Sequence, residues 1–174
     1  MHIPDGFIRT DINVATYAVA IAVCAVVCTK AKKAWEEKQI PLIGVTAAFI
    51  FAAQMLNFPV AGGTSGHFLG ALFAALLVGP LAGFLIMALV LAVQCLVFAD
   101  GGLTALGTNI VNMGLIGGIL AYYFFKVLRF SLPNNRRNFL IATAIAAWSS
   151  VVMASAACAL ELALSGAEIG RAHV

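Results

Sequence analysis

The nitrogen atoms of Met1, His2 and His67 are the groups in this chain best suited to hold a transition metal. The Met1 amine, the deprotonated amide nitrogen of His2 and the His2 imidazole Nδ1 form fused five- and six-membered chelate rings. These three nitrogens are close to coplanar and leave one corner of a square open, which a nitrogen of His67 can fill. Square-planar nitrogen ligation suits Ni(II) or Cu(II) rather than magnesium, calcium or tetrahedral zinc.

A plainer interpretation of the same residues exists, and spacing alone favours it. His2 is then an exposed terminal residue and His67 an interfacial helix cap, because two histidines so far apart form no motif and chain termini are usually frayed. The turn signal Pro4-Asp5-Gly6 favours the metal site, since it can fold the terminus back toward the protein.

Two further polar residues are candidates for a supporting layer around a ligand. Asp5 either orients a ligand histidine as a hydrogen-bond acceptor or caps a turn. Asn109 shares a helix face with Asn112, and the pair either lines a cavity or joins neighbouring helices by hydrogen bonds.

The composition indicates a membrane protein. Hydrophobic residues make up 63% of the 174 and charged residues only 10%, with a mean hydropathy of +1.03. Soluble domains are about 45–50% apolar and about 25% charged, so a soluble enzyme, a disordered tail and a nucleic-acid binder are excluded. Between Gln39 and Phe125 the only charged residue is Asp100. The four cysteines show no metal or disulfide spacing and are interpreted as packing residues.

The apolar segments predict an all-α bundle of six transmembrane helices. One segment, His67–Ala99, has 33 residues and would make a helix of about 50 Å, too long for a single crossing. Gly79-Pro80 interrupts it, so we expect one helix ending near Val78 and another over Leu81–Ala99. The remaining predicted spans are Ile12–Thr29, Ile40–Phe58, Thr108–Phe125 and Phe139–Leu164.

Two basic clusters support this count and set the orientation. Basic loops stay in the cytoplasm, and an even number of crossings must therefore separate the two clusters. Splitting His67–Ala99 gives four crossings between them. The N-terminus and the loops 59–66 and 100–107 are then expected outside, with Met1 as the mature first residue, since the positive charge follows the first span. The clusters are Lys30, Lys32, Lys33 and Lys38, and Lys126, Arg129, Arg136 and Arg137.

The last residues look foreign to the rest of the chain. Residues 168–174, EIGRAHV, resemble the translation of a sequencing-library adapter; the alternative is an ordinary short polar tail. We therefore treat 1–166 as a single integral membrane domain, and we exclude 167–174, with His173, from the site.

Three blocks, MHIPDGF, NFPVAGGTSGH and LVFADGGLTALGTNIVNMG, resemble one family: the membrane substrate-binding (M) components of nickel and cobalt energy-coupling-factor ABC transporters. The similarity runs from Met1 to about Gly166. It implies that the Met1 amine, the His2 amide and imidazole nitrogens, and His67 hold the metal. It also implies a further C-terminal helix, so the chain is expected to be truncated before a seventh helix.

The resemblance further implies partners and a location. These are a transmembrane coupling subunit, two cytoplasmic ATPases, a small auxiliary membrane subunit and the lipid bilayer of a prokaryotic cell membrane. The bound Ni(II) or Co(II) is then the transported substrate, and no cofactor is expected. The coupling subunit would tilt the metal-loaded protein so that its site opens inward.

The blocks also bear on the metal and on rival functions. The cobalt branch of the family typically begins MHIMEG, whereas Pro4-Asp5-Gly6 and the GGTSGH block are closer to the nickel branch, so Ni(II) is favoured over Co(II). The alternatives are cobalt uptake feeding cobalamin synthesis, an autonomous secondary carrier or channel, and a purely structural subunit. We expect no enzyme: the chain has no phosphate-binding G-x-x-x-x-G-K-[ST] loop and no H-E-x-x-H motif.

Overall fold

The structure, a computed structural model, describes residues 1–34, 39–60 and 64–166, and the side chains of 31–34 are not described. The tail at 167–174 therefore lies outside the described residues. The elements are α1 (Thr10–Ala34), α2 (Ile40–Gln54), β1 (Asn57–Val60), β2 (Thr64–His67), α3 (Ala71–Val78), α4 (Pro80–Phe98), α5 (Leu106–Asn109), η2 (Ile110–Leu120), α6 (Ala121–Ser131) and α7 (Arg136–Leu164).

Helices dominate the described chain, and four are long and apolar enough to cross a membrane. They are Thr10–Lys30, Pro80–Phe98, Leu106–Ser131 and Arg136–Leu164. The third joins α5, the π-helical η2 and α6. The predicted count of six complete spans is not reproduced. Helix α2 has 15 residues. Helix α3 has eight, and at about 1.5 Å per residue these eight cover less than half of a hydrocarbon core.

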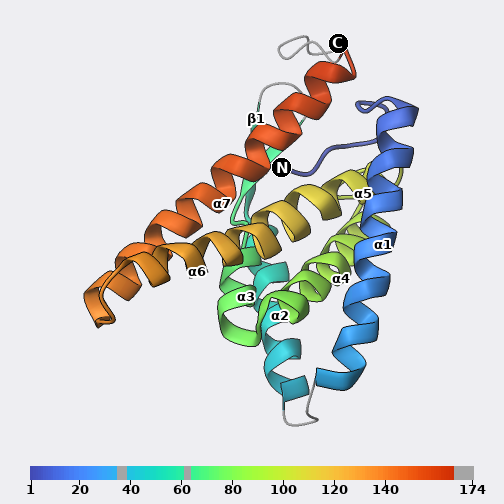
Figure 1. Cartoon of the computed structure of the whole chain (residues 1–174). Coiled ribbons are helices and arrows are strands. Elements are labelled where there is room, and N and C mark those ends of the chain that lie inside the picture. Colours follow the sequence, from blue (N-terminus) through green and yellow to red (C-terminus); the bar gives the residue numbers. More distant parts are fainter. Residues whose placement is uncertain (35–38, 61–63, 167–174) are drawn as a thin grey trace.

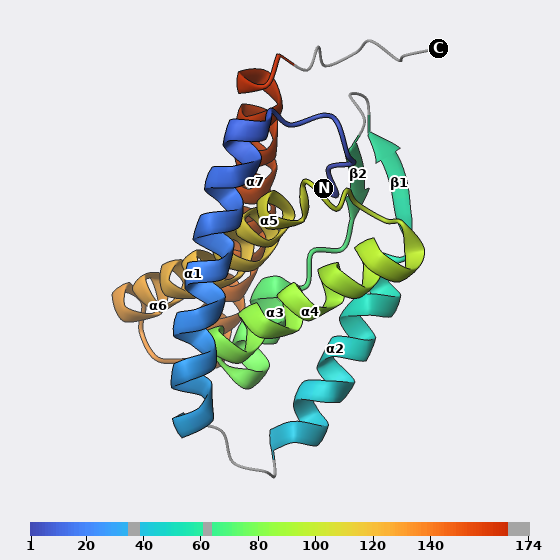
Figure 2. The same ribbon diagram turned by 90° about the vertical axis from the view of Figure 1, so that its right-hand side faces the viewer.

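The break at Gly79-Pro80 is confirmed. Helix α3 ends at Val78 and α4 begins at Pro80, with Gly79 at a φ of 90° between them. Proline suits the first turn of a helix, where its missing N–H costs nothing. The chain turns back here, and α3 packs against α4 so closely that a Cβ on Gly83 would lie 2.7 Å from the Ala75 nitrogen (Figure 2).

A β-hairpin corrects the all-α prediction. Strands β1 and β2 pair antiparallel, with Asn57 opposite His67 and Val60 opposite Thr64. His67 therefore lies at the end of a strand and not at the start of a helix. Pro59 is the physical reason for the difference, because proline in a helix interior removes a hydrogen bond and clashes with the preceding turn. The expected helix Ile40–Phe58 consequently ends at Gln54.

The N-terminal segment, residues 1–9, lies at the end of the bundle where the hairpin, the α4–α5 loop and the C-terminal part of α7 meet (Figures 1 and 2). The described parts of the two loops predicted to share one side with the N-terminus thus lie together at one end. Ile3 is fully buried in a small apolar cluster with Ile8, Ala105, Cys158 and Leu162. This cluster anchors the segment by burying its apolar side chains.

Candidate metal site

The N-terminus is held inside the protein by hydrogen bonds at successive residues. The Met1 amine donates to the Ser65 carbonyl and, at 3.3 Å, to Ser65 Oγ. Ile3 N donates to Asn109 Oδ1 at 3.0 Å, and Asn109 Nδ2 donates to the Ile3 carbonyl at 3.2 Å. The Gly102 amide also donates to Ile3 O, at 2.8 Å. The segment is therefore fixed between β2 and the start of the third long helix.

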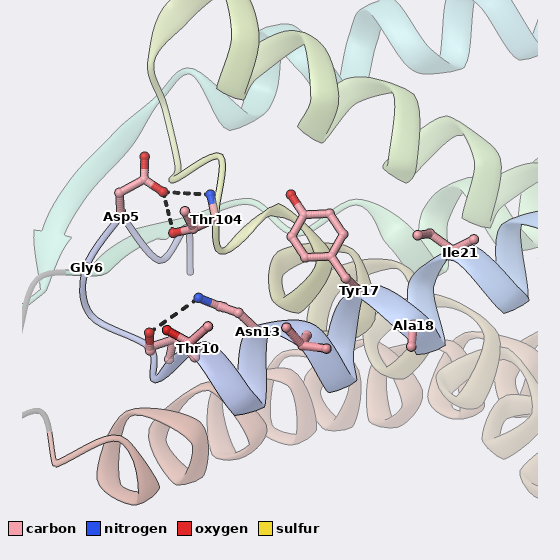
Figure 3. A pocket seen from close by; sticks show the side chains of 10 residues that line it. Asp5, Gly6, Thr10, Asn13, Tyr17, Ala18, Ile21 and Thr104 are labelled. Carbon is pink, nitrogen blue, oxygen red and sulfur yellow. Dashed lines mark hydrogen bonds between the residues drawn. The ribbon is translucent and has the colours of Figure 1, made fainter.

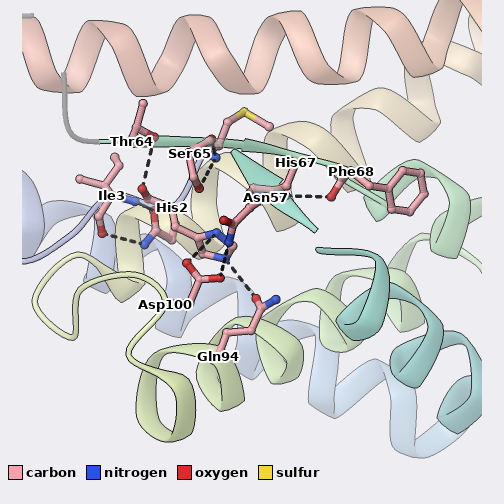
Figure 4. A network of polar contacts seen from close by, with 11 residues as sticks. His2, Ile3, Asn57, Thr64, Ser65, His67, Phe68, Gln94 and Asp100 are labelled. Atoms are coloured by element: carbon pink, nitrogen blue, oxygen red, sulfur yellow. Dashed lines mark hydrogen bonds and ion pairs between the residues drawn. The ribbon is translucent and has the colours of Figure 1, made fainter. Parts of the chain in front are cut away.

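Hydrogen bonds between the N-terminal segment and β2 bring the two histidines together across 65 positions of sequence. The ring centroids of His2 and His67 lie 4.6 Å apart, with an angle of 31° between the planes (Figure 4). His2 is 4% exposed, and Thr64 Oγ1 donates to its carbonyl at 3.2 Å. The exposed terminus and the helix cap of the plainer interpretation do not describe this arrangement.

Each imidazole has one nitrogen paired and the other free. His2 Nε2 lies 3.1 Å from Gln94 Oε1, and His67 Nδ1 lies 2.8 Å from the Phe68 carbonyl (Figure 4). Both oxygens only accept hydrogen bonds, so His2 carries its proton on Nε2 and His67 on Nδ1. The opposite nitrogens, His2 Nδ1 and His67 Nε2, are buried and have no hydrogen-bond partner among the described residues. These two lone pairs are available to a metal ion.

Asp100 supplies negative charge beside the histidines. Its Oδ1 lies 3.5 Å from His2 Nδ1, and Asn57 Nδ2 donates to its other oxygen at 3.5 Å (Figure 4). Neither Asp100 nor Gln94 is among the candidate site residues predicted from the sequence. The available signal was the isolation of Asp100, the only charged residue between Gln39 and Phe125.

Asp5 and Asn109, the expected supporting residues, take different places. Asn109 binds the backbone of Ile3, next to His2. Asp5 Oδ1 accepts from Thr104 N at 2.7 Å and from Thr104 Oγ1 at 2.6 Å (Figure 3). Asp5 thus ties the N-terminal segment to the α4–α5 loop, and the histidine neighbour is Asp100. The cavity beside Asp5 has about 760 Å³ and extends along α1 past Tyr17 to Ile21, and no histidine is among the described residues that line it (Figure 3).

Burial keeps the candidate donors neutral near pH 7. Desolvation lowers the pKa of the Met1 amine to about 6, with smaller opposing effects from Cys158 and Asp100. Desolvation and the neighbouring amine together lower the pKa of His2 and of His67 to about 4. Metal ions bind neutral imidazole and amine, so protons compete weakly at these nitrogens.

The donor set is unusual because it combines side-chain and terminal nitrogens. Among the described residues, no group of three or more His, Cys, Asp or Glu side chains is arranged to hold a metal ion. A site here depends instead on two imidazoles, the Met1 amine and the amide between Met1 and His2. Such a set offers four nitrogens, the chemistry that Ni(II) and Cu(II) accept in a square plane.

Comparison with known proteins gives one consistent result. Residues 2–172 match the family described as "Cobalt uptake substrate-specific transmembrane region". The chain is 42% identical over 165 residues to the "Putative fused nickel transport protein NikMN" of Archaeoglobus fulgidus, covering 95% of this chain and 53% of that protein. It is 31% identical to the fused nickel transport protein NikMN of Rhodobacter capsulatus, covering 92% and 46%. The chain thus spans about half the length of these two relatives.

A solved structure agrees in fold. The crystal structure of a truncated transition metal transporter superposes with a TM-score of 0.87 at 34% identity, covering 94% of this chain and 75% of that one.

Proposed function

Because this chain belongs to the cobalt uptake substrate-specific transmembrane family, whose members transport nickel and cobalt, we propose that it captures a divalent transition metal ion at Met1, His2 and His67 and passes it across the membrane. The Met1 amine, the His2 amide nitrogen, His2 Nδ1 and His67 Nε2 are the four ligands. The ion is the cargo of the protein.

One observation carries the proposal: the two histidines offer complementary free nitrogens at a buried point. Among the described residues, His2 Nδ1 and His67 Nε2 have no hydrogen-bond partner, and the centroids of their two rings lie 4.6 Å apart. A buried polar atom without a partner costs about 1–3 kcal/mol, so two at one place indicate a site built for a ligand. The Met1 amine lies beside the same strand, bonded to Ser65.

Ni(II) is the proposed cargo in preference to Co(II). A chelate of amine, deprotonated amide and imidazole imposes a square plane, a geometry typical of Ni(II) and Cu(II). The relative at 42% identity is named a putative fused nickel transport protein, which supports the same choice, whereas a second protein of Archaeoglobus fulgidus at 34% identity is named a putative cobalt transport protein. Cobalt uptake remains the alternative outcome of the metal-binding test.

Transport is proposed to need further subunits. By its resemblance the chain acts as the substrate-specific subunit of an energy-coupling-factor transporter, with a transmembrane coupling subunit, two cytoplasmic ATPases and a small auxiliary membrane subunit. The N-terminus and the site would face outward in a prokaryotic cell membrane. The coupling subunit would then turn the site toward the cytoplasm.

The test measures metal stoichiometry and visible absorption of the purified protein, with its native N-terminus and with one residue added before Met1. The expected result is one Ni(II) per chain with a square-planar absorption band, lost on extension. A protein extended by one residue at its C-terminus is the matched control and should bind normally. Mass spectrometry must also find the Met1 amine unmodified in the binding-competent protein. Equal binding by the native and the N-terminally extended proteins, or a blocked amine in metal-bound protein, would refute the chelate.

A further inference from the structure

Gln94 is a fully buried glutamine on α4 that bonds to the ligand histidine and not to another helix. We infer that Gln94 is a positioning residue that keeps the proton of His2 on Nε2 and thereby reserves Nδ1 for the metal. This inference rests on the proposed function for its consequence in metal binding. The proton position itself exists in the metal-free protein and can be measured there.

The chelate makes the choice of nitrogen decisive. A metal bound to the His2 amide nitrogen closes a six-membered ring through Cα, Cβ, Cγ and Nδ1. Closure through Nε2 would need a larger ring that the planar imidazole cannot form, because Nε2 points away from its own backbone. A neutral imidazole carries one proton on either nitrogen, and the hydrogen bond made by one nitrogen sets the state of the other. An acceptor at Nε2 is therefore what this chelate needs.

The hydrogen-bond partner of His2 Nε2 in the described structure is the amide oxygen of Gln94. Gln94 Oε1 lies 3.1 Å away, and the contact is buried. At the opposite nitrogen, Asp100 Oδ1 is 3.5 Å from Nδ1, beyond a good hydrogen bond, and Nδ1 is left unpaired. The nearer acceptor thus holds the proton, and the carboxylate remains beside the position that a cation would occupy.

The backbone of Gln94 places both of these neighbours of His2. The Asp100 amide donates to the Gln94 carbonyl at 3.0 Å, which closes the C-terminal end of α4. Ala99 adopts a left-handed conformation there, with φ of 53°, and turns the chain back. The Gln94 side chain and the Asp100 carboxylate therefore approach the two nitrogens of one ring from a single helix end.

In His67 the opposite nitrogen, Nδ1, carries the proton, and no side chain is needed as its acceptor. Its Nδ1 donates to the carbonyl of the next residue, Phe68, so its proton is fixed by local backbone. His2 precedes all regular structure and requires an acceptor from a distant part of the chain. This difference explains why a buried polar side chain occurs in the apolar helix α4 at position 94.

Four proteins test the inference: wild type, Gln94→Met, Gln94→Glu and Gln54→Met. Gln94→Met keeps the length of the side chain and removes the oxygen acceptor. Gln94→Glu restores an acceptor at the same place. Gln54→Met is the matched control, because Gln54 is equally buried but donates to the Leu69 carbonyl and not to a histidine.

The first readout is the ¹⁵N spectrum of the histidine rings in metal-free protein in micelles, with His67→Ala used to assign the signals. Wild type, Gln94→Glu and Gln54→Met should show His2 with an unprotonated Nδ1 and a protonated Nε2. Gln94→Met should show a mixture of the two tautomers or a protonated Nδ1. Because an unfolded chain also gives a mixture of tautomers, circular dichroism and thermal unfolding must show that Gln94→Met is folded like Gln54→Met. An unchanged His2 tautomer in Gln94→Met, or a protonated Nδ1 in wild type, would overturn the inference.

The second readout is Ni(II) affinity by competition with a chromophoric chelator. Loss of a residue that orients a metal-bound histidine lowers affinity about 10–100-fold, and Gln94→Met should fall in this range. Gln94→Glu and Gln54→Met should stay within a few-fold of wild type. Wild-type affinity in Gln94→Met would refute the positioning role while leaving the proposed function intact. Absence of binding by wild type would refute the proposed function, and the tautomer measurement would still judge Gln94.

Discussion

Asn109 binds Ile3 through both backbone polar groups, accepting from its amide at 3.0 Å and donating to its carbonyl at 3.2 Å. A single buried side chain thus fixes the residue that follows His2 to the start of the third long helix. The asparagine amide matches the peptide group of Ile3, donor to acceptor and acceptor to donor. The direction of His2 depends on this contact as much as on Gln94.

Asn109→Leu should weaken metal binding without unfolding the bundle. The Ile3 amide would lose its acceptor, at a cost of about 1–3 kcal/mol, while the Ile3 carbonyl keeps the Gly102 amide. We expect Ni(II) affinity to fall about tenfold or more, measured by chelator competition. Asn138→Leu is the control, because Asn138 bonds to the Pro133 carbonyl in the α6–α7 connection. Equal affinity of the two variants would contradict the role of Asn109.

His67→Ala should remove one of the four proposed ligands and leave the fold intact. The loss should exceed the roughly 10–100-fold effect typical of residues behind a ligand. Among the described residues, the His67 side chain makes one local hydrogen bond, to the Phe68 carbonyl, and a ring contact with His2, so thermal unfolding of the metal-free protein should change little. Affinity is measured by titration calorimetry and folding by circular dichroism. Unchanged Ni(II) affinity in the folded variant would eliminate the proposed site.

Gly102→Ala should displace the N-terminal segment. A Cβ there would lie 2.3 Å from Asp5 N and 2.6 Å from the Pro4 carbonyl carbon, both backbone atoms. Overpacking of this kind costs about 1–3 kcal/mol, and the least costly relief is withdrawal of residues 4 and 5. Ni(II) affinity should therefore drop, while Gly44→Ala, whose added methyl meets nothing within 4 Å, should bind normally. Normal Ni(II) binding by Gly102→Ala would contradict this prediction, because it would mean that residues 4 and 5 can move without disturbing the site.

The metal-free protein should lose stability as pH falls. The folded pKa of the Met1 amine is about 6 against an ordinary 8.0, and those of His2 and His67 are about 4 against 6.5. Between each pair of values the unfolded chain binds more protons than the folded protein. The stability that each neutral group contributes is therefore complete above its ordinary pKa and is lost as the pH falls to its folded pKa. The amine lowers the free energy of unfolding as the pH falls from 8.0 to about 6, and the histidines lower it from 6.5 to about 4.

Denaturant unfolding of metal-free protein across this pH range measures the effect. The double variant His2→Gln, His67→Gln is the control and should lack the decline between pH 6.5 and about 4 that comes from the histidines. A wild-type stability that rises as pH falls through this interval would contradict the buried, neutral state of both rings.

Glu161 should matter for stability and not for metal affinity. Asn112 Nδ2 donates to Glu161 Oε2 at 2.5 Å, which joins η2 to α7, and Asn112 Oδ1 has no partner among the described residues. Glu161→Leu would leave the whole Asn112 amide unpaired and should destabilise the protein by about 1–3 kcal/mol. Glu161→Gln keeps an acceptor and should be nearly neutral. A large loss of Ni(II) affinity in Glu161→Leu would assign this pair to the metal site instead.

Composition and one glycine–proline pair predicted much of the fold, because apolar length and helix breaking are local properties. The break between Val78 and Pro80 followed from the missing proline N–H. The hairpin was missed because strands β1 and β2 have only four residues each and lie at the ends of two expected spans and in the loop expected between them. The helix α3 has only eight residues because Gly70, with a φ of 78°, precedes its first residue and Gly79 follows its last.

Only the part of the site that lies in adjacent residues could be predicted from the sequence. Met1 and His2 are adjacent, so their chelating capacity can be read from the sequence. Gln94 and Asp100 acquire their place from the end of α4 and from the docking of the N-terminal segment. Both are tertiary relationships, and no spacing within α4 distinguishes a histidine acceptor from a glutamine that joins two helices.

The docked N-terminal segment imposes an order on biosynthesis. Met1 to Asp5 leave the ribosome first, yet their partners are Ser65, Asn109 and Ser155, made much later. The complete set of these contacts can therefore form only after almost the whole described chain has been made. Docking of the first residues closes the longest loops in the molecule and is expected to be among the last steps of folding. Any enzyme that modifies the amine has to act during this interval, before the terminus is enclosed.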